Sequence, residues 1–360
     1  MYTVSIVYPH IACIFNTITC ERRIPMTATN QYPIIITVSQ SNEADYRTVD
    51  EALKALERID HTHADAVPAL IRIGRGTYQE RLTIRRPYLT LEGEDAADTV
   101  LTYGLYARMP SEDIGKLGTF RSYSCLIDTH DFTARNITFA NSSGKGTDVG
   151  QALALYADGD RLVFDRCRFL GGQDTLFTAP LPPAEIEPNG FIGPKQHEPR
   201  LNGRHYYKSC YIEGDIDFIF GGATAYFETC ELYSKDTGNE INSFVTAAST
   251  PQGQEYGYVM KNCLFTGNCP PGTAYLGRPW REYAKTILLD CYIGEHIREE
   301  GWHDWNKPQA RKTVLYAEYG SYGPSSDINK RPGWVKALTT AEAQHYSKSK
   351  VLGGNDRWQP

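Results

Sequence analysis

A short unit of alternating apolar and polar residues recurs along the chain and begins with cysteine in most copies. Such alternation places the apolar side chains on one face of an extended segment. The copies lie at 89–93, 137–139, 167–171, 210–214, 230–232, 263–267 and 291–294. Cysteine holds the first inward position in five of them, and the intervals range from 20 residues (Cys210 to Cys230) to 48 residues (Leu89 to Ile137).

A fixed pattern at uneven intervals predicts the coils of a solenoid that are joined by loops of variable length. Long helical patterns between the units are almost absent, which argues against a doubly wound α/β fold. We therefore predict an all-β parallel β-helix that forms a single domain over residues 31–360. An irregular β-sandwich is the alternative, but it gives no reason for a repeated cysteine unit.

The repeated cysteines are expected to stack in the interior as a ladder of small apolar groups. The chain has nine cysteines, an odd number, and no Cys-x-x-Cys pair, so we do not predict a disulfide framework. The nine histidines are scattered without the spacing of metal ligands. We therefore predict no metal site and no cofactor.

Two segments have a helical pattern. Residues 46–59 form an amphipathic stripe, and a helix there could cover the open end of the solenoid. The stripe consists of Val49, Ala52, Leu53, Leu56 and Ile59. Residues 340–347 are the second candidate. By contrast, the proline-rich stretch 179–204 has no strand pattern and is expected to form an inserted loop near the functional site.

The net charge and the N-terminal residues bear on the partners and on the location of the protein. The net charge of −6 gives no basic footprint for nucleic acid, and no apolar run is long enough to span a membrane. Residues 1–30 form an atypical extension whose apolar stretch is broken by Asn16 and preceded by no Lys or Arg, unlike a secretory signal. Translation could instead begin at Met26. We expect action in the cytoplasm, where thiols stay reduced, with secretion as the alternative.

Two aspartates and one arginine lie in distinctive contexts. They are Asp174 in Gln-Asp-Thr-Leu at 173–176, Asp217 in Asp-Phe-Ile-Phe-Gly at 217–221 and Arg278 in Leu-Gly-Arg-Pro-Trp at 276–280. When two carboxylates lie close together, the pKa of one is raised, and an arginine beside the other keeps that one anionic. The three residues could therefore supply a proton donor and a nucleophile from one type of side chain.

Each of these residues also has a structural interpretation. Aspartate is common in turns, Arg278 could form a surface salt bridge, and Trp280 could belong to the core. Asp215 is a rival for Asp217, because residues two apart on a strand point the same way. Gln151 could be an inward polar residue with satisfied hydrogen bonds.

Together with Gly-Thr-Tyr-Gln-Glu at 76–80 and Gln-Ala-Leu-Ala-Leu at 151–155, these motifs resemble those of the pectin methylesterases. These carbohydrate esterases remove methyl groups from galacturonan. The resemblance covers roughly residues 35–357, and five motifs in the same order make it specific. It implies a right-handed parallel β-helix, in agreement with the repeat.

The resemblance also implies roles. Asp217 would attack the ester carbonyl, while Asp174 would protonate the departing methanol and then activate water. Gln151 and Gln173 would hold the oxyanion, and Arg278 would orient Asp217. This chemistry is self-consistent. A covalent intermediate divides the hydrolysis into two steps, and methoxide, a poor leaving group, needs an acid that protonates it. The neutral amides stabilise the oxyanion without adding charge, and the reaction requires no metal.

The expected substrate is a methylated polysaccharide or oligogalacturonide, hydrolysed by a monomer. Trp280, Phe218 and Tyr206 are the candidate substrate-binding residues. Lys195, His197 and Arg200 of the insertion could meet galacturonate carboxylates.

Two other functions are compatible with the sequence. The first is a pectate lyase or polygalacturonase, which share the architecture and the polymer. The second is a non-catalytic β-helix that binds polysaccharide.

Overall fold

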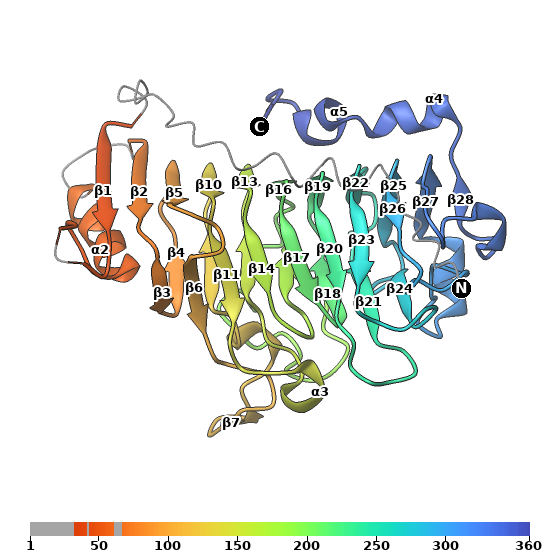
Figure 1. Ribbon diagram of the computed structural model, residues 1–360, viewed down its shortest axis with the longest axis horizontal. Helices are drawn as coiled ribbons and strands as arrows, with labels where there is room; N and C mark the ends of the chain where they lie inside the picture. Colours follow the sequence, from red (N-terminus) through yellow and green to blue (C-terminus); the bar gives the residue numbers. More distant parts are fainter. Residues whose placement is uncertain (1–31, 42, 61–66) are drawn as a thin grey trace, which may run out of the picture.

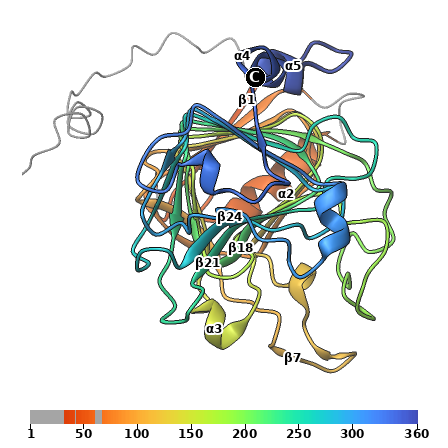
Figure 2. The same ribbon diagram turned by 90° about the vertical axis from the view of Figure 1, so that its right-hand side faces the viewer.

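The computed structural model describes residues 32–41, 43–60 and 67–360. The predicted extension over 1–30 and the alternative start at Met26 lie outside these ranges. The strands stack as successive coils of a right-handed parallel β-helix, as predicted (Figure 1). Figure 2 looks along the stack and shows the sheets enclosing the interior.

Three parallel sheets form the walls of the solenoid. The first sheet contains β1 (Ile34–Val38), β2 (Ala69–Ile73), β5 (Leu89–Gly93), β10 (Phe132–Arg135), β13 (Leu162–Asp165), β16 (Arg204–Lys208), β19 (Thr224–Glu228), β22 (Tyr258–Lys261), β25 (Lys285–Leu289), β27 (Leu315–Tyr319) and β28 (Lys336–Ala337). The second contains β3 (Gly76–Gln79), β6 (Thr99–Tyr103), β11 (Thr138–Asn141), β14 (Arg168–Leu170), β17 (Tyr211–Gly214), β20 (Glu231–Ser234), β23 (Leu264–Gly267) and β26 (Tyr292–Ile293). The third contains β4 (Leu82–Ile84), β9 (Cys125–Asp128), β12 (Leu155–Asp158), β15 (Leu176–Thr178), β18 (Ile216–Gly221), β21 (Ser243–Ala248) and β24 (Ala274–Gly277).

The remaining elements lie at the ends and on the outside of the solenoid. They are the hairpin β7 (Pro110–Ser111) and β8 (Gly115–Lys116), the helices α2 (Val49–Asp60), α3 (Gly146–Val149), α4 (Thr340–Ala343) and α5 (Lys348–Gly353), and the short 3₁₀ helices η1 (Thr119–Arg121), η2 (Pro308–Lys312), η3 (Ile328–Lys330) and η4 (Gln344–Tyr346). No helix among the described residues is long and apolar enough to cross a membrane.

The cysteine ladder is present at the corner between the first and second sheets. The five cysteines are Cys167, Cys210, Cys230, Cys263 and Cys291, and all are buried with free thiols. Each Sγ donates to a carbonyl in the preceding coil at 3.3 to 3.5 Å. Six of the seven predicted units contribute to the second sheet, whereas the unit at 89–93 forms β5 of the first.

A left-handed residue precedes each of the five ladder cysteines, and another precedes Ile137 at the same corner one coil earlier; each turns the chain from the first sheet to the second. The sequence patterns did not reveal them, because several of these residues are of types that rarely adopt positive φ. They are Asn136, Arg166, Ser209, Thr229, Asn262 and Asp290, with φ between 51° and 54°. Their N–H groups donate to carbonyls of the next coil, so the hydrogen-bond ladder continues through the corner.

The predicted N-terminal helix is confirmed as α2, which begins at Val49 and ends at Asp60. Its apolar stripe packs into the core of the first coils. Glu80, which had no assigned role in its motif, accepts from the N–H groups of Val49 (3.0 Å) and Asp50 (2.8 Å). A carboxylate at this position satisfies free N–H groups and complements the helix dipole.

The C-terminal segment lies along the outside of the first sheet (Figures 1 and 2). The predicted helix at 340–347 is divided into α4 and η4, and α5 continues beyond it. Arg204 of β16 holds this segment through Asp356, with Nη1 and Oδ1 2.5 Å apart. At the far end of the coils Trp302, stacked on Tyr316, donates to Glu318 at 2.9 Å.

The ladder thiols should resist alkylation in the folded protein. Burial excludes the reagent from all five thiols. For Cys167, burial also raises the pKa of the thiol to about 12, so its reactive thiolate is scarce at neutral pH. Peptide mapping after iodoacetamide treatment should find these five cysteines unmodified in the native protein. Protein unfolded in denaturant is the control and should be alkylated at all five. Modification of the native ladder would show that the coils open readily.

Candidate active site

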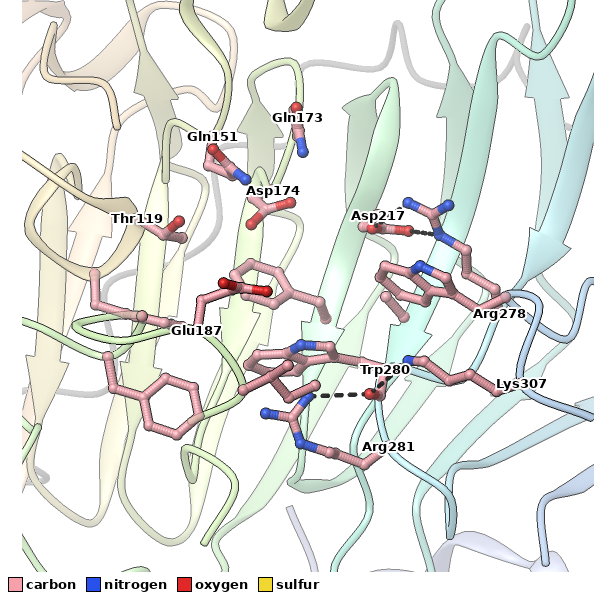
Figure 3. Close-up of a pocket in the computed structure, with 17 residues that line it drawn as sticks. Thr119, Gln151, Gln173, Asp174, Glu187, Asp217, Arg278, Trp280, Arg281 and Lys307 are labelled. Carbon is pink, nitrogen blue, oxygen red and sulfur yellow. Dashed lines mark hydrogen bonds and ion pairs between the residues drawn. The ribbon is translucent and has the colours of Figure 1, made fainter. Parts of the chain in front are cut away.

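A cavity of about 510 Å³ opens on the outer face of the third sheet. It is lined by all the residues predicted for catalysis and by the predicted tryptophan (Figure 3). These are Gln151, Gln173, Asp174, Asp217, Arg278 and Trp280. They come from positions far apart in the sequence that successive coils place side by side.

The backbone of two adjacent coils aligns the glutamines. Gln151 and Gln173 face each other as a parallel bridge, just before β12 and β15. The N–H of Asp174 donates to the carbonyl of Ile216 at 3.0 Å, which ties this coil to the one carrying Asp217. The site is therefore built by ordinary coil-to-coil hydrogen bonds.

Both aspartates have left-handed backbone conformations, with φ of 63° for Asp174 and 53° for Asp217. Aspartate adopts this conformation more readily than most residues. The pairing of β18 with β21 is also irregular between Ile216 and Ile219. The positive φ of Asp217 and this irregular pairing both break the regular alternation of side chains along β18.

Arg278 binds Asp217 through two parallel hydrogen bonds. Nε donates to Oδ1 at 2.8 Å and Nη2 donates to Oδ2 at 2.7 Å. The guanidinium lies between the rings of Phe244 (3.9 Å) and Trp305 (3.7 Å). This two-sided packing holds the charged fork in one orientation, and the fork in turn orients the carboxylate.

The surroundings of the two aspartates affect their pKa values differently. Burial raises the pKa of both carboxyl groups, and the charge of Arg278 opposes this rise for both, but only Asp217 also accepts hydrogen bonds from Arg278. The negative charge of Asp217 raises the pKa of Asp174 further, and Asp174 has no hydrogen-bond partner for its carboxyl among the described residues. The pair therefore favours a protonated Asp174 beside an anionic Asp217.

The rival Asp215 does not reach the cavity. It precedes β18, and its carboxylate accepts from the N–H of Ile216 at 2.6 Å. The expectation that it would point the same way as Asp217 is wrong, because the irregular pairing interrupts the alternation. Its charge still contributes to the raised pKa of Asp174.

Two predicted substrate-binding residues lie elsewhere. Phe218 is 0% exposed and belongs to the core inside the coils, while Phe220 of the same strand lines the cavity. Tyr206 lies on the first sheet, where it donates to Glu228 and packs under the C-terminal segment. The predictions for Phe218 and Tyr206 are wrong, because one side chain points inward and the other lies on a different sheet.

The insertion contributes to the cavity, but through other residues than predicted. It forms no strand between Ala179 and Gly203, and Phe191 packs edge-on against Trp280 with centroids 6.2 Å apart. The other lining residues from this loop are Ile186, Glu187 and Gly190.

The basic residues of the insertion do not line the cavity. Lys195 pairs with Asp128 at 2.7 Å and with Asp158 at 3.7 Å. Arg200 donates to four backbone carbonyls of the loop, and exposed His197 is not among the lining residues. The prediction that these three residues meet substrate carboxylates is wrong, because two of them hold the loop itself.

Several lining residues were not predicted. Thr119 and Phe120 come from η1, Ala247 comes from β21, and Trp305 and Lys307 come from the segment before η2. Aromatic side chains near the motifs were visible in the sequence, but nothing indicated which coil they would face. Within 32–41, 43–60 and 67–360, no three His, Cys, Asp or Glu side chains are grouped as a metal ion would need.

Comparisons with known proteins give one consistent result. A family model described as Pectinesterase matches residues 35–181 and 200–355. The stretch between these two ranges, 182–199, lies within the insertion. Pectinesterase 31 of Arabidopsis thaliana is 34% identical over 320 residues, which cover 87% of this chain and 90% of that protein. The solved structure of pectin methylesterase PemA from Erwinia chrysanthemi matches with a TM-score of 0.70 at 29% sequence identity. The match covers 91% of this chain and 98% of PemA. A pectin methylesterase in complex with a hexasaccharide has a TM-score of 0.71 at 28% identity, with coverage of 91% and 99%.

Replacement of Arg278 by Gln should raise the pKa of Asp217, because burial would then act on this carboxyl without an opposing positive charge. A carbon NMR titration of the labelled carboxyl would measure the change. Arg75→Gln is the matched control, because among the described residues Arg75 pairs only with exposed Glu94 and Asp98, and it does not line the cavity. An unchanged pKa in Arg278→Gln would contradict the charge assignment.

Proposed function

This chain belongs to the pectinesterase family, and we propose that it hydrolyses the methyl esters of pectin to free carboxylate and methanol. The observation that carries the proposal is the asymmetric aspartate pair. Asp217 is bound by Arg278 through both oxygens, while Asp174 lies in the same cavity without an ion-pair partner among the described residues. An esterase that uses one carboxylate as its nucleophile and a second carboxyl group as its acid needs this division into anion and acid.

In the first half of the proposed reaction, a carboxylate oxygen of Asp217 attacks the carbonyl carbon of the methyl ester. The carbonyl oxygen becomes an oxyanion, and the side-chain amides of Gln151 and Gln173 supply N–H donors to it. As the bond to methoxy oxygen breaks, Asp174 gives its proton to that oxygen and methanol leaves. The product is a mixed anhydride between Asp217 and the galacturonate carboxyl.

In the second half, the ionised Asp174 takes a proton from water. The hydroxide that forms attacks the galacturonate carbonyl of the anhydride, and the bond to the Asp217 oxygen breaks. This step restores the Asp217 carboxylate, releases a free galacturonate carboxyl and leaves Asp174 protonated for the next cycle. Arg278 stabilises Asp217 as attacking group and as leaving group, because its two hydrogen bonds favour the anion in both steps.

The cavity suits a chain of sugars. The indole of Trp280 is half-buried among Phe120, Phe177 and Phe191, so its position is fixed before a sugar ring contacts it. A solved relative holds a hexasaccharide, which supports a methylated polysaccharide or oligogalacturonide as substrate.

Methanol release and chain cleavage distinguish the proposed function from the alternatives. Methyl-esterified galacturonan, supplied as highly methylated pectin and as methylated oligomers without added calcium, should yield methanol with no new reducing ends. Chain cleavage without methanol would favour a lyase or polygalacturonase, and binding without turnover would favour a non-catalytic protein. Release from oligomers alone would support the predicted cytoplasmic location, whereas release from both substrates would favour export.

Asp217→Asn should lower turnover at least about a thousandfold, because the amide is not a nucleophile. The fold should survive, since the amide oxygen can still accept a hydrogen bond from Arg278, and circular dichroism during heating would check this. Asp215→Asn is the matched control two residues away and should keep most of its turnover. Equal losses in the two variants, or an unfolded Asp217→Asn, would contradict the assignment of the nucleophile.

The pH profile of kcat/KM should be bell-shaped. Rising pH first ionises Asp217, which is needed as a nucleophile, and then removes the proton from Asp174, which is needed as an acid. Burial raises the pKa of both groups, so both limbs should lie above the ordinary range for aspartate. Initial rates of methanol release across the pH range would test this. A profile without a descending limb at higher pH would be inconsistent with Asp174 as the acid.

A further inference from the structure

A strained turn carries one of the two aromatic rings that hold Arg278. Trp305 and Asn306 have φ of 56° and 54°, in the left-handed region that bulky residues rarely adopt. The turn lies just before η2, and the indole of Trp305 lies against the guanidinium of Arg278 at 3.7 Å. Because such a conformation persists only where its surroundings hold it, the contacts that hold this turn bear on the position of Arg278.

Two side chains accept the backbone N–H groups of the turn. Nδ1 of His303 accepts from the N–H of Trp305 at 2.9 Å, and Oδ1 of Asp304 accepts from the N–H of Asn306 at 2.9 Å. The N–H of His303 in turn donates to the carbonyl of Gly277 at 3.0 Å. His303 therefore joins the turn to the end of β24, directly before the arginine.

The imidazole of His303 also reaches the other ring that holds Arg278. Its centroid lies 5.7 Å from that of Phe244 and 5.2 Å from that of Tyr275, edge-on to both rings. Phe244 and Tyr275 stack on each other at 5.2 Å, and the guanidinium lies 3.9 Å from Phe244. One side chain thus contacts the backbone of Trp305 on one side of the guanidinium and the ring of Phe244 on the other.

Only one form of His303 can accept this N–H group. Nδ1 accepts a hydrogen bond when the imidazole is neutral and carries its proton on Nε2, whereas both ring nitrogens of an imidazolium are donors. Burial lowers the pKa of His303, and the charge of Arg278 acts in the same direction. Arg298 and Arg311 also lower this pKa, while Asp304 raises it. The neutral acceptor is therefore the favoured form at neutral pH.

The turn affects the nucleophile through Arg278. Its guanidinium donates to both oxygens of Asp217, at 2.8 and 2.7 Å (Figure 3). A guanidinium between loosely held rings would align these two bonds less well and would stabilise the carboxylate anion less. The pKa of Asp217 would then rise, and fewer molecules would carry the anionic nucleophile at low pH.

We propose that His303 is a positioning residue for Arg278, which it holds through the backbone of Trp305 and the ring of Phe244. His303 does not line the active-site cavity and faces a separate cavity of about 490 Å³, so it acts on the reaction through the arginine. This inference rests on the proposed methylesterase function. It adds a residue behind the catalytic face that helps to set the charge state of the nucleophile.

His303→Phe removes the acceptor and keeps a ring against Phe244 and Tyr275. It should raise the pKa of Asp217, in the same direction as Arg278→Gln but by less, in a carbon NMR titration of the labelled carboxyl. The ascending limb of the pH profile should move to higher pH with it. On that limb, kcat/KM for methanol release should fall about fivefold, the effect of one lost hydrogen bond.

His303→Asn is the rescue variant. Its Oδ1 lies at the same distance from Cβ as Nδ1 and can accept the N–H of Trp305, as asparagine does in an Asx turn. It should keep the wild-type pKa of Asp217 and most of kcat/KM. His345→Phe is the matched control, because His345 is exposed, lies in η4 and does not line the cavity. It should change neither value.

Circular dichroism during heating would check that the variants are folded. His303→Leu also lacks the acceptor and gives the same comparison if the ring of His303→Phe is not accommodated. An unchanged pKa of Asp217 in a folded variant without the acceptor, or the same rise in His303→Asn, would overturn the positioning role. The titration observes the carboxyl directly and does not depend on turnover. Absence of methanol from the wild-type protein would instead reject the methylesterase function itself.

Discussion

Hydrogen bonding between successive coils is the interaction on which the whole structure depends. Each strand satisfies its N–H and C=O groups only through the coils above and below it, so the register of one coil sets the register of the next. The left-handed corner residues extend this ladder through the turn and bring the following cysteine to the inside. A regular interior of stacked aromatic rings follows, such as Phe164, Tyr207 and Phe227 at centroid distances of 4.9 and 4.6 Å.

The same ladder places the functional side chains. Gln151 and Gln173 pair directly across two coils, and Arg278 reaches Asp217 over the intervening strand β21. A rigid stack permits charges to be held in a largely buried cavity without collapse of the site. Asp174 and Asp217 are 7% and 6% exposed, and only Asp217 lies against a guanidinium, which favours its anionic form over that of Asp174.

The loops outside the coils add residues to the cavity that the stacked strands form. The insertion adds Phe191 and Glu187 to the cavity and fixes Arg281 through the carbonyl of Ala184. It is held in place by the contact of Lys195 with Asp128 and Asp158 on the third sheet. The residues of the catalytic face therefore come from successive coils. Part of the surroundings of the substrate comes instead from a loop that lies partly outside the match to the family model.

The sequence by itself determined the solenoid, the cysteine ladder, the capping helix and six of the residues that line the cavity, which are Gln151, Gln173, Asp174, Asp217, Arg278 and Trp280. The fold features follow from local alternation, and the cavity residues follow from the motifs and their resemblance to the pectin methylesterases. Only the tertiary structure decided that Phe218 points inward, that Tyr206 lies on another sheet and that Lys307 reaches the cavity. The irregular pairing at β18 accompanies the first position, the pairing of β16 within the first sheet sets the second, and the course of the segment before η2 sets the third. All three depend on contacts between coils that no local pattern encodes.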